Sequence, residues 1–207
     1  FPGRVGRGEN LPGDPAGWAG VINYVDASIV NVARSNVDAI DFQIDIEKDF
    51  GRLGRMHLYG VASRQNELST RVLESTPWVD RIGYSDGILP VRGNVGIDWN
   101  IGQSTLSMNT QYYDDYLVYA STLPQSSRGQ AAMRQGSDRI PSQSYTDVNY
   151  RYNFDRGFLS GSWFSLGVRN IFNKIPPIIA SSNPYGGYST FGDPRLRTYV
   201  INFEMTF

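Results

Sequence analysis

The side chains that most often carry catalysis or bind transition metals are scarce in this 207-residue sequence, which contains one histidine, His57, and no cysteine. A Ser-His-Asp catalyst needs its histidine beside a nucleophile and an orienting acid, and a zinc site takes several His, Cys or carboxylate ligands. One histidine without cysteine is a poor basis for either. We interpret His57 as an ordinary strand residue and predict a protein that is not an enzyme, with no catalytic residue, metal ligand or cofactor.

Charged side chains form small groups that could bind ions. The carboxylates gather at Asp45, Glu47 and Asp49 and again at Asp114 and Asp115, and candidate anion-binding arginines are Arg92, Arg151 and Arg169. The acidic groups lack the spacing of an EF-hand calcium loop. Asp45 and Glu47 alternate with apolar residues and are interpreted as part of a wet surface, whereas Asp114 and Asp115 lead toward a loop, where they could bridge a calcium ion. The arginines could pair with acids or attract an anionic ligand. With 19 basic and 20 acidic residues and a net charge of −1, the sequence predicts no nucleic-acid partner.

The elements that position these side chains are strands, because apolar and polar residues alternate with a period of two. In one segment Ile40, Phe42 and Ile44 share one face, while Asp41 and Gln43 share the other. Seven segments carry this pattern, the first extending back toward Ile29: Val37–Asp49, Arg55–Ser69, Pro90–Asn100, Ser104–Val118, Gln143–Phe154, Ser162–Phe172 and Thr198 to the C-terminus.

Short and long connections alternate between the predicted strands. The short ones are 50–54, 101–103 and 155–161, and the long ones are 70–89, 119–142 and 173–197. Outer-membrane barrels have short turns on the periplasmic side and long loops outside. The fold expected is therefore all-β: an antiparallel transmembrane β-barrel, of which this chain is a C-terminal fragment of about seven strands. Seven strands with open edges do not close, which favours truncation of a longer chain.

Residues 1–28 are rich in glycine and proline and read as an outer loop, extended at its end around Val21–Val25. Residues 29–207 hold the strands and their loops. Aromatic residues fall where the strands would cross the two membrane interfaces. The periplasmic set is Phe50, Trp99, Phe154 and Phe207, and the outer set is Tyr112, Tyr116, Phe172 and Tyr199.

The last third resembles the TonB-dependent outer-membrane receptors. Residues 166–177, LGVRNIFNKIPP, are similar to the family's penultimate strand and its loop, and residues 192–200, GDPRLRTYV, followed by alternation to Phe207, resemble its closing strand. Leu196-Arg197 stands where the family usually has Gly-Arg. Residues 139–148 resemble a late strand less specifically. The motif residues are Asn170, Phe172, Asn173, Pro176, Pro177, Asp193, Pro194, Arg197, Tyr199 and Phe207.

The resemblance implies a barrel of about 22 strands with a plugged lumen, whose plug and TonB-contact segment lie upstream and are absent here. It implies a bacterial outer-membrane location and active import of a scarce nutrient, such as siderophore-iron, cobalamin or an oligosaccharide. The partners implied are outer-membrane lipid, the TonB system through the missing parts, the barrel-assembly machinery through the C-terminal strand, and a small nutrient ligand. Candidate ligand contacts in the last loop are Asn183, Tyr185, Tyr188 and Phe191.

Two other classes of protein fit the same pattern. A passive porin shares the barrel but lacks a plug, and its uptake does not depend on TonB. A soluble carbohydrate-binding β-sandwich shares the alternation, would use Tyr and Trp as a binding platform, and predicts a monomer that is soluble without detergent.

Overall fold

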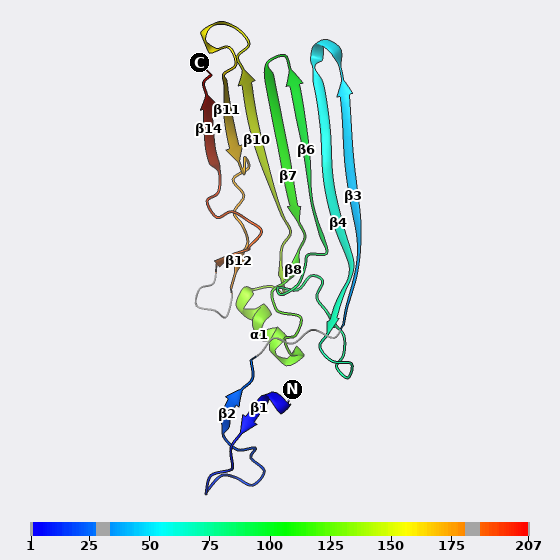
Figure 1. The fold of residues 1–207 in the computed structure, drawn as a ribbon, viewed down its shortest axis with the longest axis vertical. Helices are drawn as coiled ribbons and strands as arrows, with labels where there is room; N and C mark the ends of the chain where they lie inside the picture. Colours follow the sequence, from blue (N-terminus) through cyan, green and yellow to red (C-terminus); the bar gives the residue numbers. More distant parts are fainter. Residues whose placement is uncertain (1, 28–33, 181–186, 207) are drawn as a thin grey trace.

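A computed structural model describes residues 2–27, 34–180 and 187–206 of the chain (Figure 1). Its main feature is one antiparallel sheet whose strands lie in the order β14-β11-β10-β7-β6-β4-β3, with β5 added beside β4. The strands are β3 (Arg34–Asp49), β4 (Arg55–Arg71), β5 (Val79–Asp80), β6 (Val91–Ile101), β7 (Ser104–Tyr113), β10 (Gln143–Asn153), β11 (Trp163–Arg169) and β14 (Thr198–Glu204). The all-β antiparallel prediction is confirmed. Within the described chain the sheet is open, with β3 and β14 at its edges.

The strand register sorts the alternating residues into two faces. On what we call the apolar face, one row crosses the whole sheet from β3 to β14 through Ile46, Leu58, Ile97, Met108, Val148, Val168 and Tyr199. The neighbouring row includes Trp99, Leu106 and Leu166. Although they lie on interior strands, Met108 is 45% and Leu166 47% exposed. The apolar face is therefore open to its surroundings rather than packed against a second layer of the described chain.

The opposite, polar face carries the hydrophilic half of each strand. One of its rows is Glu47, His57, Asp98, Ser107, Asn149, Gly167 and Val200. In the described strands its acidic residues are Asp41, Asp45, Glu47, Asp49, Asp98, Asp147 and Glu204, and its arginines are Arg55, Arg92, Arg151 and Arg169. The polar face thus has an excess of negative charge.

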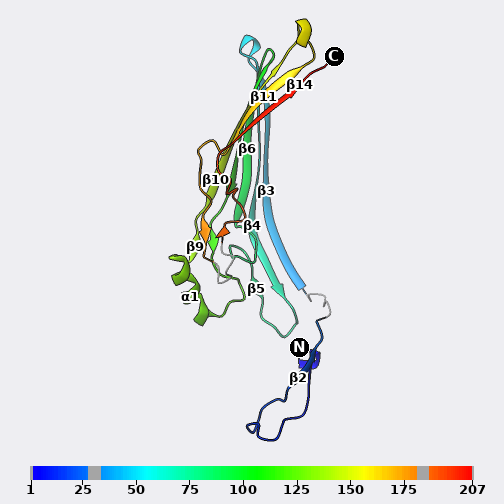
Figure 2. The ribbon, with the colours of Figure 1, turned by 90° about the vertical axis from the view of Figure 1, so that its left-hand side faces the viewer.

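Connections of the two lengths gather at opposite ends of the sheet, as the sequence predicts (Figures 1 and 2). One end, the turn end, holds the links 50–54, 102–103 and 154–162, with short 3₁₀ helices at Gly51–Leu53 and Gly157–Leu159. The Trp99 ring N–H donates to the Leu53 carbonyl there, at 2.8 Å. The other end, the loop end, holds residues 72–90, 114–142, 170–180 and 187–197.

The loop end contains structure that the alternation does not reveal. Its elements are β8 (Tyr116–Leu117) paired with β9 (Arg139–Ile140), the helix α1 (Gln125–Gln135), and β12 (Ile178–Ile179) paired with β13 (Gly187–Tyr188). Helix α1 ends at Gly136, whose φ of 80° is the left-handed conformation that glycine adopts readily at a helix C-terminus. No helix among the described residues has the length and apolarity needed to cross a bilayer.

Residues 1–28 are likewise not wholly irregular. A 3₁₀ turn at Pro2–Arg4 leads into β1 (Val5–Arg7), which pairs with β2 (Ile22–Val25) in a hairpin that extends beyond the loop end (Figure 1). The extended segment expected around Val21–Val25 is β2. The suggested extension of the first strand to Ile29 falls outside the described residues, as does Phe207.

The fourth predicted strand is shorter than expected. It ends at Tyr113 instead of Val118, and after Asp114 and Asp115 the chain turns into β8. Tyr116, which we expected at the outer membrane interface, is 4% exposed and packs with Leu89 and Ile140 in the buried core of the loops. The described chain therefore has its apolar core at the loop end, while the sheet is a single layer.

Candidate functional site

The three long connections of the loop end are joined by hydrogen bonds into one layer. The buried Ser189 hydroxyl of the last loop lies 3.1 Å from the Tyr116 hydroxyl and accepts a hydrogen bond from Gln143 Nε2 at 2.8 Å. Burial raises the pKa of the Tyr116 phenol above its ordinary value, partly offset by Ser189. On the other side, Gln135 at the end of α1 donates to the Ile178 carbonyl and accepts from the Ala180 amide. The second and the last long connections are therefore held together at two separate places.

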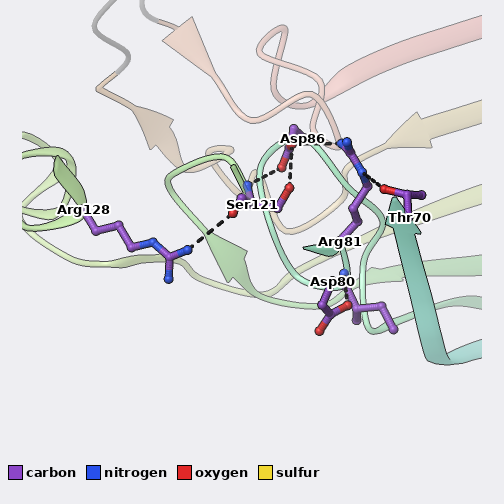
Figure 3. Close-up of polar contacts among 7 residues, drawn as sticks. Thr70, Asp80, Arg81, Asp86, Ser121 and Arg128 are labelled. Carbon is purple, nitrogen blue, oxygen red and sulfur yellow. Dashed lines mark hydrogen bonds and ion pairs between the residues drawn. The ribbon is translucent and has the colours of Figure 1, made fainter. Parts of the chain in front are cut away.

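A charged network joins the first two long connections (Figure 3). Asp86 accepts from the Ser121 amide at 2.7 Å and its hydroxyl at 2.9 Å, and pairs with Arg81 at 3.1 Å. Arg81 also donates to Thr70, while Arg128 of α1 donates to the Ser121 carbonyl. Burial pushes the pKa of Asp86 upward, but the Ser121 hydrogen bonds and Arg81 outweigh it and leave this pKa below its usual value. The network ties α1 to the end of β4.

The last loop folds back over the polar face of the sheet. The Phe191 ring stacks on Tyr113 of β7, with centroids 5.2 Å apart, and meets Tyr116 edge-on at 5.7 Å. Gly192 lies so close to the sheet that a Cβ there would overlap the Tyr145 hydroxyl and come within 2.6 Å of the buried Pro176 ring. Only a residue without a side chain fits this close approach, so the glycine at this position permits the loop to fold inward.

The motif residues that resemble the receptor family hold the two ends of this loop. Asn170 is 5% exposed and left-handed (φ 50°); its amide N–H donates to Asp147, and its side chain donates to the Lys174 carbonyl and accepts from the Lys174 amide. Asn173, also left-handed, accepts from the Arg197 amide at 3.0 Å. Asparagine tolerates this conformation better than most residues. In the described chain these residues close the loop.

The remaining motif residues have different surroundings. Pro176 is fully buried, whereas Phe172 and Tyr199 are 67% and 68% exposed, Tyr199 lying on the apolar face. The Pro177 carbonyl accepts a hydrogen bond from the Ser189 amide, and Pro194 lines a recess between the last loop and the polar face. Asp193 is held by Arg195, which donates from its backbone amide and its guanidinium, the shortest contact being 2.6 Å. Phe207 lies outside the described residues.

The Asp193 carboxylate is expected to titrate with a midpoint near 2. The Arg195 side chain, followed by the Arg195 amide, lowers the pKa of Asp193 to about 2 from the ordinary 3.8. Because the folded-state pKa is depressed, the contact is intact above pH 4 and is lost as the pH falls through about 2. Carboxyl ¹³C NMR of the protein in micelles measures the midpoint, with Asp193→Asn to assign the resonance. Arg195→Gln should return it toward 3.8; a midpoint already near 3.8 without that substitution would contradict the pairing.

A recess of about 610 Å³ lies between the inward-folded loop and the polar face. The sheet contributes Gln111, Tyr145, Asp147 and Arg169, and the loop contributes Phe191 together with Gly192 and Asp193. Its volume lies within the roughly 300–1,000 Å³ common for small-molecule sites. It is the candidate binding site of the described chain.

The polar face near the turn end holds the histidine. His57 Nε2 lies 3.2 Å from Asp45 Oδ1, and its Nδ1 lies 3.9 Å from Asp98 Oδ2. The carboxylates contact opposite ring nitrogens, so they do not converge on one point as metal ligands do. Within the described ranges, no three His, Cys, Asp or Glu side chains are grouped to hold a metal ion. This arrangement fits a polar wall.

The three arginines singled out in the sequence have separate environments. Arg151 lies over the Trp163 ring at 4.2 Å and donates to Asn153. Arg169 lines the recess, and Arg92 lines a broader hollow of the polar face farther toward β3. They do not form one cationic cluster.

Of the four candidate ligand contacts, Asn183 and Tyr185 fall outside the described residues. Tyr188 is 46% exposed in β13, and Phe191 lines the recess while packing on Tyr113. Sequence reasoning missed Gln111, Tyr145 and Asp147, whose place at the recess follows from the fold of the last loop. The sequence placed these three residues on the polar side of two predicted strands, which was the one indication that they could contact a ligand.

No protein-family model and no curated protein matches the chain. Among solved structures, it is similar to the crystal structure of the ferric citrate transporter FecA in the unliganded form, with a TM-score of 0.50 and 16% sequence identity. The match covers 84% of this chain and 25% of that chain, so the present chain spans about a quarter of the length of FecA. At this identity the likeness concerns the fold alone.

Proposed function

We propose that this chain forms part of the wall and outer loops of an outer-membrane receptor that imports a scarce nutrient with energy supplied through TonB, and that it has no catalytic role. The observation that carries the proposal is the apolar face, which runs unbroken across seven strands and stays exposed. In water such a surface is a liability for aggregation, whereas against lipid it is the expected outer side of a barrel.

Other features support the same proposal. The turns and loops segregate to opposite ends of the sheet, and the fold is similar to part of a ferric citrate transporter. The open edges at β3 and β14 leave backbone groups that must pair in hydrocarbon. Further strands of the same protein would close the barrel, and a plug inside it would face the polar side. A soluble β-sandwich is disfavoured, because its apolar face would be covered.

Uptake by the complete protein distinguishes energised import from passive diffusion. Bacteria that produce it, with and without TonB, would be given labelled ferric citrate, cobalamin and neutral oligosaccharides. We expect one of these nutrients to accumulate above its external concentration only when TonB is present, and not in cells lacking the protein. Equilibration to the external concentration, unchanged by loss of TonB, would show a passive channel and contradict the proposal.

A further inference from the structure

We propose that the recess under the last loop binds a neutral, polyhydroxylated ring of the sugar type, so that the imported nutrient is a carbohydrate and not an anionic metal chelate. This inference rests on the proposed function and adds the chemical class of the ligand. Three observations carry it: the unused hydrogen-bonding groups of the recess, its charge balance, and its aromatic wall.

The polar groups of the recess leave both donors and acceptors unused. In the described chain Gln111 accepts a hydrogen bond from the Tyr113 hydroxyl through Oε1, while its amide nitrogen and the Arg169 guanidinium donate no hydrogen bond. Asp147 uses Oδ1 to accept from the Asn170 amide, which leaves Oδ2 without a partner in the same ranges. A hydroxyl group is both a donor and an acceptor, so a ligand with neighbouring hydroxyls can satisfy the three groups together.

The charges of the recess and of the polar face argue against a polyanion. One guanidinium, Arg169, is flanked by the carboxylates of Asp147 and Asp193, and Asp193 is already paired with Arg195. The carboxylate surplus of the polar face lies away from the recess, on β3 and β6, and the recess itself, lined by Asp147, Asp193 and Arg169, has no surplus of positive charge. A site without surplus positive charge does not raise the local concentration of anions. A chelate with several negative charges would need the reverse.

The recess also offers a flat apolar surface beside its polar groups. Phe191 is fixed by its contacts with Tyr113 and Tyr116, so its ring is held in place before any ligand binds. The Tyr145 ring, buried beside it, is oriented by a hydrogen bond from its hydroxyl to Gln143 at 2.9 Å. A rigid aromatic side chain supplies contact area at little cost in conformational entropy. The C–H face of a sugar ring can pack there while its hydroxyls reach Asp147 and Arg169.

Binding to the complete protein in detergent tests the ligand class. The probes are an array of neutral oligosaccharides built from glucose, mannose, galactose and xylose, with oligogalacturonates as acidic counterparts, and ferric citrate by calorimetry. We expect binding of neutral members only. Asp147→Asn, which keeps the Oδ1 acceptor for the Asn170 amide, should weaken that binding about tenfold or more. Phe191→Ala should weaken it comparably.

Matched controls are available on the same chain. Asp98→Asn changes a carboxylate of the polar face near the turn end, and Phe158→Ala changes an 84% exposed ring beyond that end; both should bind as the unaltered protein does. Heat-dependent gel mobility verifies that each variant is folded. Binding restricted to acidic sugars or ferric citrate, absence of binding to every neutral sugar, or neutral binding unaffected by Asp147→Asn would overturn the inference. TonB-dependent accumulation of ferric citrate would do so while leaving the proposed function intact.

Discussion

Met108→Arg is expected to lower the stability of the folded protein in a lipid bilayer by about 2–4 kcal/mol, the cost of an arginine at the lipid-facing midplane of a barrel. Met108 lies at the middle of β7, in the apolar row that crosses the sheet, and is 45% exposed. An arginine there would place its guanidinium in hydrocarbon, without water or a counter-charge. Urea titration of the refolded complete protein in vesicles measures the change.

The matched control is the next residue along the strand. Asn109 points to the polar face, opposite Gly96 and Asp147. Asn109→Arg introduces the same side chain one position away, where water and the Asp147 carboxylate are close, so the free energy of unfolding should change by less than about 1 kcal/mol. Equal destabilisation by the two substitutions would contradict the assignment of the faces.

Gly87→Ala should disrupt the layer of long connections at the loop end, because among the described glycines of that layer its added Cβ would make the shortest contact. A Cβ at Gly87 would overlap the Arg81 carbonyl oxygen, which is backbone and cannot rotate away. The turn must shift, and the adjacent Asp86 then loses its alignment with the Ser121 amide and hydroxyl. We expect a cost of about 1–3 kcal/mol, as for overpacking of a fitted site, measured as faster proteolysis of the loops in intact cells.

Gly129→Ala is the matched control for this change. Gly129 lies inside α1, and a Cβ there meets nothing within 4 Å. Alanine is the better helix former by roughly 0.5–1 kcal/mol, so this variant should resist proteolysis as well as or better than the unaltered protein. If Gly87→Ala behaved like Gly129→Ala, the close turn at Arg81 would not be a fixed feature of the loops.

The strands could be predicted because the two faces of this sheet carry side chains of opposite polarity. Alternation as sharp as that of Asp147–Asn153 fixes the strand, its register and its two faces at once. The prediction failed where that difference ends. After Tyr113 the chain leaves the sheet, and the aromatic Tyr116 looked like a membrane-interface residue when it is in fact the centre of the loop core.

The candidate site could be predicted only in part. Phe191 drew attention as an aromatic residue in a long loop, but its partners Tyr113 and Tyr116 are far away in sequence. The inward fold of the loop depends on such distant contacts and on the fit of Gly192 against Tyr145 and Pro176. Helix α1 was not predicted from the sequence for a related reason. Its Gln, Ser and Ala residues form no apolar stripe, and its last residue, Gln135, is held by a hydrogen bond to the Ile178 carbonyl of the last loop.

Spin labelling along β7 tests most directly whether one face of the sheet meets lipid and the other meets water. The chain contributes no cysteine of its own, so a single cysteine introduced at each position from Leu106 to Gln111 can be labelled in the complete protein in bilayers, once any cysteine elsewhere in that protein is replaced by serine. We predict that labels at 106, 108 and 110 are relaxed by oxygen dissolved in lipid, and labels at 107, 109 and 111 by a water-soluble nickel complex. Labels at 106 and 108 that neither reagent reaches, as in a packed soluble core, would contradict the account.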